Sequence, residues 1–245
     1  MLNSMQNLAA IARLRAPSGD VPFADFGNTS RLFDGVNDVI RVTDNANFPL
    51  GSQTWCAWVY AIDLSGGRDV MAQWAATGLQ KKVVMYAQAT GAIGFYLTQN
   101  GNTTKSAVSA SGTIVATGQW QHVVGRFTSS TEIAMFVDGS SVATETNGVY
   151  SSLFDSSVDF TIGLRDDPGT QLWWGGKIAD VRIYDRALTD GEILDLAAGT
   201  DVASGLFGHY IKDADFIANV AIDYGSGGNN GTNSGSTFDA GGPGD

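Results

Sequence analysis

The chain has 245 residues, a formal net charge of −11 and 43% hydrophobic residues, enough apolar material for a core between two sheets. No basic cluster is longer than the pair Lys81 and Lys82, so the composition argues against nucleic acid and anionic membranes as partners. The 31 glycines against 5 prolines predict many tight turns rather than a disordered chain. The single cysteine, Cys56, excludes a disulfide within the chain.

Residues 1–15 favour a helix with one narrow apolar stripe, which a proline at position 17 stops. The stripe consists of Met1, Met5, Leu8 and Ala12. Because so short a helix is marginal in water, two interpretations stay open, a segment that packs on a partner and a frayed tail. Residues 17–29 are expected to form a linker to the first strand.

The middle of the chain alternates between short apolar runs and turn residues, the pattern of an all-β protein. The expected strands cover residues 38–43, 54–62, 70–74, 83–88, 92–98, 120–128, 133–137 and 158–164. Residues 54–62 are apolar on both faces, which predicts a central strand covered on both sides. Residues 101–118 predict an edge strand or a long loop, and Asp138 with Gly139 predicts a hairpin turn.

Residues 173–196 predict one long strand followed by one short helix. The strand part is rich in β-branched and aromatic residues. Thr189 is placed to cap the helix and to form a capping box with Glu192, and Gly199 is placed to end it. The prediction is one short helix near residues 189–198 in a chain that is otherwise strand and turn.

Four segments carry a resemblance to a known family. They are LFDGVNDVIRV at 32–42, TWCAWVY at 54–60, WQHVVGRF followed by IAMFVDGSSVA at 120–143, and GKIADVRIYDRALTDGEI at 176–193. In this order they resemble the laminin-G-like jelly-roll domains of the concanavalin A-like lectin/glucanase superfamily. The resemblance implies an all-β, two-sheet antiparallel jelly-roll sandwich over residues 30–222, with residues 1–29 as an N-terminal appendage. It implies much less about function, because this fold hosts lectins, adhesion modules, glycosidases and spacers.

After Gly199 the composition shifts towards glycine, asparagine and serine. GLFGHY at 205–210 and DYGSGGNNGT at 223–232 resemble the opening strand and turn of the same family. The segment therefore completes the sandwich by permutation, is the vestige of a second repeat, or is a flexible tail. We expect residues 206–222 to lie against the sandwich and assign residues 223–245 to a Gly/Asn-rich C-terminal tail, with about ten terminal residues loosely held.

The sequence lacks the usual catalytic patterns. The glucanases of this superfamily carry paired carboxylates as E-x-D-x-x-E on one strand, and no such run occurs here. His122 and His209 lie in apolar, strand-like contexts, and neither G-x-S-x-G nor a phosphate loop is present. We predict a protein that is not an enzyme and that needs no nucleotide or redox cofactor.

Glycan recognition is the better supported prediction, because it needs aromatic rings and hydrogen-bonding groups on loops. The candidate ligand-binding residues are Trp173, Tyr150, Asp166, Asp167, Asn100 and Asn102. The remaining tryptophans are expected to fill the core of the sandwich. These are Trp55, Trp58, Trp74, Trp120 and Trp174.

Calcium is a second hypothesis, since relatives of this kind hold it through loop carboxylates and carbonyls. The candidate ligands are Asp34, Asn37, Asp38 and Asp138. Turn geometry alone is the alternative explanation of these residues.

Three functional hypotheses follow. The first is a non-enzymatic lectin-like module on a virion, as a capsid decoration, head fibre or tail attachment protein. The second is a cell-surface carbohydrate-binding or adhesion module, and the third a divergent glycoside hydrolase. The first is favoured because Arg13 and Arg15 follow the weakly apolar start, the reverse of a secretory signal peptide. This first hypothesis predicts that the protein is made in the host cytoplasm. It also predicts that residues 1–29 attach the protein to a virion shell or join copies of the chain in a homo-oligomer.

Overall fold

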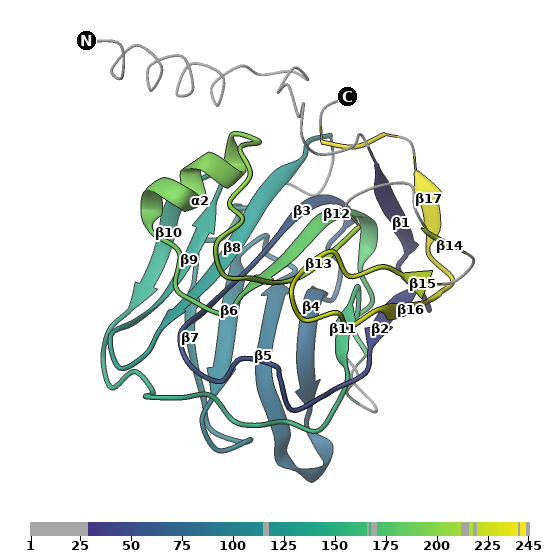
Figure 1. The fold of residues 1–245 in the computed structure, drawn as a ribbon. Coiled ribbons are helices and arrows are strands. Elements are labelled where there is room, and N and C mark those ends of the chain that lie inside the picture. Colours follow the sequence, from purple (N-terminus) through teal and green to yellow (C-terminus); the bar gives the residue numbers. More distant parts are fainter. Residues whose placement is uncertain are drawn as a thin grey trace.

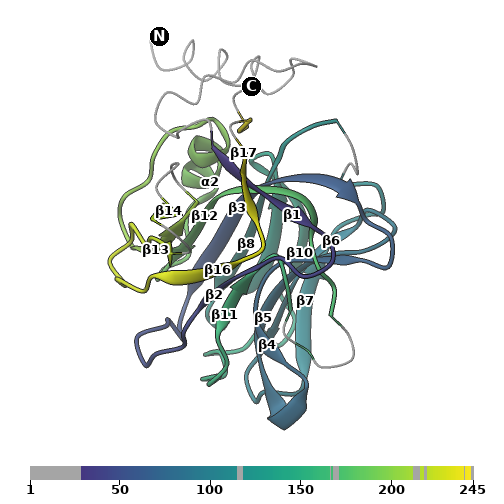
Figure 2. The ribbon, with the colours of Figure 1, turned by 90° about the vertical axis from the view of Figure 1, so that its right-hand side faces the viewer.

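Two antiparallel sheets pack face to face in a computed structural model of the chain (Figures 1 and 2). It describes residues 29–114, 118–165, 167, 171–211, 216–217, 220–239 and 241–243. The predicted N-terminal helix and linker therefore lie outside the described residues, apart from Thr29. No helix in the described ranges is long and apolar enough to cross a lipid bilayer.

Sheet A has the strand order β10-β9-β8-β3-β12-β1-β17, and β13 also pairs with β12. The strands are β10 Ser140–Glu145, β9 Glu132–Val137, β8 Gln121–Thr128, β3 Gln53–Asp63, β12 Gly175–Tyr184, β1 Ser30–Asp34, β17 Thr237–Asp239 and β13 Leu206–Tyr210. One edge of β12 is shared, since β1 pairs with its first half and β13 with its second. Asp180, with a φ of 47°, lies between the two halves, and the pairing of β12 with β3 is irregular at the same place.

Sheet B has the strand order β14-β15-β16-β2-β11-β4-β5-β6-β7. The strands are β14 Phe216–Ile217, β15 Val220–Ala221, β16 Gly231–Ser234, β2 Val39–Val42, β11 Phe160–Ile162, β4 Arg68–Ala75, β5 Gln80–Ala87, β6 Ile93–Thr98 and β7 Thr104–Val108. A short 3-10 helix, η1 (Thr77–Leu79), joins β4 to β5. The region that was predicted as an edge strand or loop forms β7, at the edge of this sheet.

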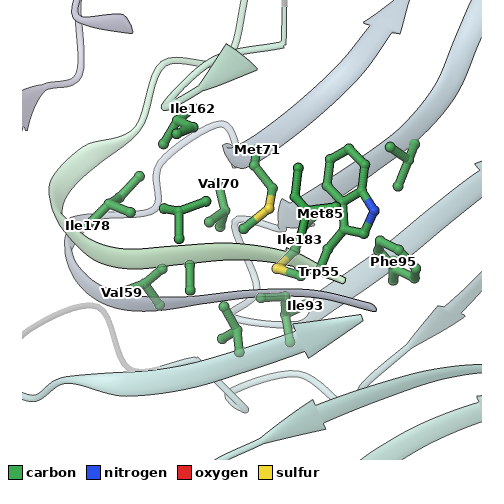
Figure 3. Close-up of a cluster of buried hydrophobic side chains, with 14 of the residues drawn as sticks. Trp55, Val59, Val70, Met71, Met85, Ile93, Phe95, Ile162, Ile178 and Ile183 are labelled. Carbon is green, nitrogen blue, oxygen red and sulfur yellow. The ribbon is translucent and has the colours of Figure 1, made fainter. Parts of the chain in front are cut away.

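The core lies between the sheets, where alternate residues of each strand meet. Figure 3 shows Trp55 and Ile183 of sheet A packed with Met71, Met85 and Phe95 of sheet B. The two-sheet jelly-roll prediction is confirmed. Burial on both faces of β3 is also confirmed, because Trp55 faces this core while Cys56 lies in a second cluster on the outer face of sheet A.

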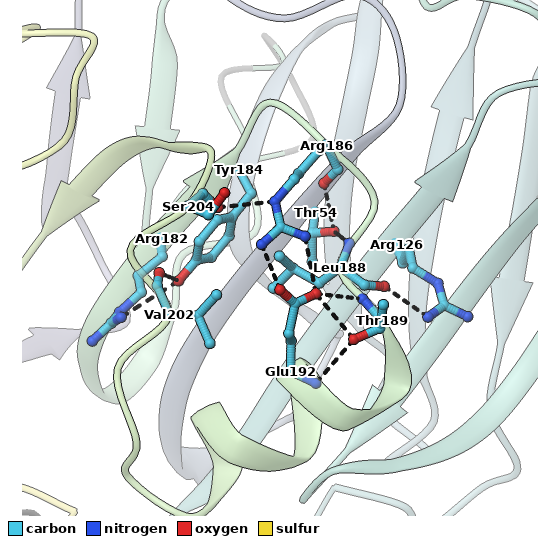
Figure 4. A network of polar contacts seen from close by, with 10 residues as sticks. All are labelled: Thr54, Arg126, Arg182, Tyr184, Arg186, Leu188, Thr189, Glu192, Val202 and Ser204. Atoms are coloured by element: carbon cyan, nitrogen blue, oxygen red, sulfur yellow. Dashed lines mark hydrogen bonds and ion pairs between the residues drawn. The ribbon is translucent and has the colours of Figure 1, made fainter.

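Helix α2 (Asp190–Ala197) covers that outer cluster, and Figure 1 shows it beside β8, β9 and β10. The predicted capping box is present, with Glu192 N–H donating to Thr189 Oγ1 at 3.2 Å and Thr189 N–H donating to Glu192 Oε2 at 2.8 Å. The guanidinium of Arg186 donates two hydrogen bonds to the same carboxylate, from Nη1 to Oε2 at 2.9 Å and from Nη2 to Oε1 at 2.6 Å (Figure 4). Ile193 then packs against Cys56 and neighbouring apolar side chains. Local capping and the burial of one helix face thus fix this element.

The assignment of residues 223–245 to a tail is wrong for its middle part. Residues 231–239 contain β16, which pairs with β2, and β17, which pairs with β1. Polar contacts hold this segment in place of apolar burial, because the guanidinium of Arg31 donates to Ser236 and Ser30 Oγ donates to Gly241 O at 2.9 Å. With β13 on β12, the residues after Gly199 complete the sandwich, which was one of the three interpretations.

The prediction that the tryptophans fill the core holds for Trp55 and Trp174 and is wrong for the other three. Trp58 and Trp120 form a small cluster on the outer face of sheet A, and Trp74 lies on the outer face of sheet B. Strand alternation is the physical reason, since a bulky apolar residue marks a covered position without saying which side of the sheet it faces.

Candidate functional site

The outer face of sheet B carries an aromatic cluster. On β4, β5 and β6, residues that alternate with core residues point away from sheet A. They include Trp74, Tyr86 and Tyr96, which pack with Ala72 and Val84. The rings of Tyr86 and Tyr96 lie 6.2 Å apart between centroids, and both tyrosines are half-buried. We call this surface the outer aromatic face.

Two cations lie over rings of the outer aromatic face. Nζ of Lys81 is 5.6 Å from the ring centre of Trp74. The guanidinium carbon of Arg165 is 5.8 Å from the ring centre of Tyr86. Both contacts are within the range of cation–π attraction, so the rings hold the two charged groups above the sheet.

Asp69 lies under Arg165 and is fully buried. Its backbone N–H donates to Leu172 O at 3.0 Å, and Arg165 Nε lies 3.5 Å from its Oδ2. Neither carboxyl oxygen makes a hydrogen bond of ordinary geometry within the described part of the chain, although the backbone N–H of Arg165 is close enough to favour the ionised form. Burial raises the pKa of Asp69 to about 7, and the charge of Arg165 opposes that rise. A buried acid with so few partners is unusual and marks this end of β4 as a candidate site.

The loop after β11 contacts both ends of β4, through Arg165 at Asp69 and through Asp167 at Ala76. Thr161 Oγ1 lies within hydrogen-bond distance of two carbonyl oxygens, 3.1 Å from Ala72 O and 2.5 Å from Leu164 O, either of which can accept its proton. Oδ1 of Asp167 accepts a hydrogen bond from Ala76 N–H at 3.1 Å. Asp167, a predicted ligand residue, therefore joins this site, whereas Asp166 lies outside the described residues. Trp173 is half-buried and follows Leu172, which bonds to Asp69.

The other predicted ligand residues gather at the β6–β7 turn. Oδ1 of Asn100 accepts hydrogen bonds from Asn102 N–H at 3.0 Å and from Thr103 N–H at 2.8 Å, and Tyr150 Oη donates to Thr103 O at 2.8 Å. Lys81 N–H donates to Gly101 O at 3.3 Å, so this turn adjoins the Lys81 end of the outer aromatic face. These groups largely satisfy one another, and a ligand role for them stays a prediction.

The calcium candidates form turns. Oδ1 of Asp34 accepts from Val36 N–H at 2.8 Å, and Oδ2 of Asp38 accepts from Asp34 N–H at 2.7 Å. Asn37 N–H also donates to Asp34, and Asp138 Oδ1 accepts from His122 N–H at 2.8 Å. Among the described residues, no group of three or more His, Cys, Asp and Glu side chains could hold a metal ion. Calcium binding stays a prediction.

A buried ionic cluster on the outer face of sheet A has a structural explanation. Oδ1 of Asp180 lies 2.8 Å from Arg182 Nε and 2.6 Å from His209 Nε2. Burial alone would raise the pKa of Asp180, but Arg182 and His209 lower it to about 2. The cluster compensates the buried charge of Asp180 at the irregular position of β12.

Comparison with known families assigns this fold. Residues 34–194 match the family described as the concanavalin A-like lectin/glucanases superfamily. The chain belongs to this superfamily. A search of curated proteins gives no match.

Several solved structures share the superfamily fold at low sequence identity. A "putative carbohydrate binding protein" from Bacteroides ovatus has a TM-score of 0.69 and 20% identity, over 87% of this chain and 60% of that one. The heptameric SAP-like pentraxin of Limulus polyphemus has a TM-score of 0.58 and 17% identity, over 86% and 94% of the two chains. The CBM40 of a Ruminococcus gnavus sialidase, bound to sialyllactose, has a TM-score of 0.54 and 14% identity, over 69% and 97%. This chain thus spans 60% of the length of the Bacteroides protein.

The sequence pointed to one part of this site and missed the rest. Asp167 was found because loops carry most binding groups. Trp74 was assigned to the core, and Tyr86, Tyr96, Asp69 and Arg165 were not singled out. One signal was available for Asp69, an acidic residue directly before the apolar run of β4.

Proposed function

We propose that the protein is a lectin-like module that binds glycans on the outer aromatic face. The observation that carries this is the cluster of Trp74 with the half-buried Tyr86 and Tyr96, in which Arg165 lies over Tyr86 and Lys81 over Trp74. Aromatic rings cover the apolar faces of sugars, and nearby polar groups bond their hydroxyls. The carbohydrate-binding names of two structural relatives support the same class of ligand.

Binding without hydrolysis is the second part of the proposal. Glycoside hydrolysis needs two carboxyl groups that reach the bond from opposite sides. Asp69 is fully buried, and Oδ1 of Asp167 accepts a hydrogen bond from Ala76 N–H. These two carboxyl groups are therefore not placed to act together as catalytic acid and base. We expect no turnover of glucans, galactans or chitin by the purified protein. Turnover that is lost on replacing Asp69 or Asp167 by the corresponding amide would favour the alternative, a divergent glycoside hydrolase.

The glycan site is tested with two tyrosines that differ in location. Tyr96 and Tyr60 are both half-buried on outer faces, the first on sheet B and the second on sheet A beside Trp120. We expect Tyr96→Ala to weaken binding of oligosaccharides found by glycan-array screening about tenfold, and Tyr60→Ala to leave it unchanged. Affinity would be measured by calorimetry after circular dichroism has shown that each variant is folded. Loss of binding in Tyr60→Ala alone would move the site to sheet A.

We place the module on the surface of a virion, with a cell surface as the alternative setting. A domain that folds without a disulfide suits assembly in a reducing cytoplasm, and Cys56 is buried under α2. The apolar stripe predicted for residues 1–15 supports attachment through residues 1–29, to a virion shell or between copies of this chain. Deletion of residues 1–20 should then yield a folded monomer that no longer joins the assembly. A deleted protein that still assembles would place the contact on the sandwich, and capsid or tail genes beside its gene would favour the virion.

A further inference from the structure

Most cationic side chains in the described part of the chain hold a carboxylate or a carbonyl oxygen. These pairs are Arg68 with Asp63, Arg126 with Glu132, Arg182 with Asp180, Arg186 with Glu192, Lys177 with Asp239, and Lys105 with the carbonyl of Asn147. Such pairing is expected in a chain with a net charge of −11, where acidic partners are abundant. Cations that reach the surface without such a partner therefore need an explanation.

Lys81 has no such pair within the described residues, and Arg165 has only a long one, with its Nε 3.5 Å from Oδ2 of the buried Asp69; both cations lie on the outer aromatic face. Within the described residues, the amine of Lys81 has one contact, the ring of Trp74. The Arg165 side chain, 16% exposed, contacts the ring of Tyr86 and approaches Asp69, and its buried Nε makes no hydrogen bond of ordinary geometry within the described residues. Lys82 also lacks a hydrogen bond, but it is fully buried over Phe48, inside the sandwich.

The rings hold the two charges in fixed places. A guanidinium over an aromatic ring keeps its N–H donors in the plane of the group, where they can bond an anion with two parallel hydrogen bonds. Because Arg165 Nε faces Asp69 from 3.5 Å, its terminal nitrogens are the atoms left for a ligand. The two charges lie towards opposite ends of the outer aromatic face, Arg165 over Tyr86 and Lys81 over Trp74, so a ligand that extends along β4 can contact both.

We propose that the outer aromatic face selects acidic glycans, whose carboxylate or sulfate group is bound by Arg165, with Lys81 as a second contact. This inference rests on the proposed glycan function and adds the chemical class of the ligand. A sugar ring packs on Tyr86 and Tyr96 while its anionic group meets the terminal nitrogens of Arg165. Bidentate, charge-assisted hydrogen bonds of this kind are stronger than hydrogen bonds between neutral groups, so they discriminate acidic from neutral sugars.

The test compares three probes by calorimetry, a sulfated heparin tetrasaccharide, an oligogalacturonide and a neutral maltotetraose. We expect at least one acidic probe to bind about tenfold more tightly than the neutral probe. Arg165→Gln should remove that preference, Arg165→Lys should keep part of it, and Lys81→Gln should weaken acidic probes about threefold. The matched control is Lys105→Gln, on the edge strand of the same sheet, where the lysine bonds to Asn147 O; this variant should bind like wild type.

The possible failures are distinguishable. Equal binding of neutral and acidic probes, or an Arg165→Gln variant that keeps the preference, overturns the acidic-glycan inference and leaves glycan binding intact. Inorganic sulfate that binds as tightly as the acidic probes reduces the site to an adventitious ion only. Absence of binding to every glycan tested removes the proposed function itself. Thermal melting of each variant separates loss of affinity from loss of fold.

Discussion

Replacing Asp69 by Asn should change how stability depends on pH. The pKa of this carboxyl is raised from 3.8 to about 7 by burial, with Arg165 opposing the rise. The folded protein therefore binds the proton more tightly than the unfolded chain. Stability contributed by the protonated carboxyl is present below about pH 4 and is lost as pH rises towards 7.

The size of the effect follows from the two pKa values. At about 1.4 kcal/mol for each pH unit between 3.8 and about 7, ionisation of Asp69 destabilises the fold by roughly 4 kcal/mol. No discount for solvent is needed, because the side chain is fully buried. Asn has nearly the same shape as Asp and no charge. The stability of Asp69→Asn relative to wild type should therefore increase by several kcal/mol as the pH rises from about 4.5 to about 8.

Urea denaturation of both proteins at several pH values in this range gives the comparison. Groups common to the two proteins cancel in the difference between their free energies of unfolding. Asp63→Asn is the matched control, since Asp63 is exposed and hydrogen bonds from Ser65 lower its pKa, so no gain at high pH is expected. A difference between Asp69→Asn and wild type that stays constant with pH would refute the reasoning.

Three further predictions concern the fold. Thr189→Ala should lower the free energy of unfolding by about 1 kcal/mol in urea denaturation, while Thr189→Ser should stay near wild type; equal stability of all three would count against the cap. Truncation after residue 230, which removes β16 and β17, should lower the melting temperature clearly, whereas an unchanged one would mean that these strands contribute little. Burial raises the pKa of the Cys56 thiol, so a thiol reagent should label it only under denaturing conditions; rapid labelling of the native protein would contradict its burial.

Local sequence patterns were enough to predict the elements that local interactions define. The cap of α2 depends on residues three apart, Thr189 and Glu192, and both hydrogen bonds of the box are present. The two apolar faces of residues 54–62 likewise placed β3 between two covered surfaces. In these cases the residues that decide the structure are neighbours in the chain, so the pattern carries the answer.

The outer aromatic face could not be predicted in the same way. Trp74, Tyr86 and Tyr96 come from three strands, and their grouping depends on the register of β4, β5 and β6. Asp69 and Arg165 meet only because the loop after β11 crosses the end of β4. The strands β16 and β17 were missed for a different reason, since polar contacts such as those of Arg31 with Ser236 leave no apolar periodicity to detect.

The pairing of β1 with β17 has a mechanical consequence. Ser30, at the start of β1, lies opposite Asp239, at the end of β17, so the described chain enters and leaves the sandwich at one point of one sheet edge. A force applied between those two points pulls β1 and β17 apart from one end, so their hydrogen bonds break one after another. A force between the N-terminal side and a point on sheet B instead acts on β1 and its longer pairing with β12. A module anchored at one end should therefore resist pulling far better than one stretched between both of its ends.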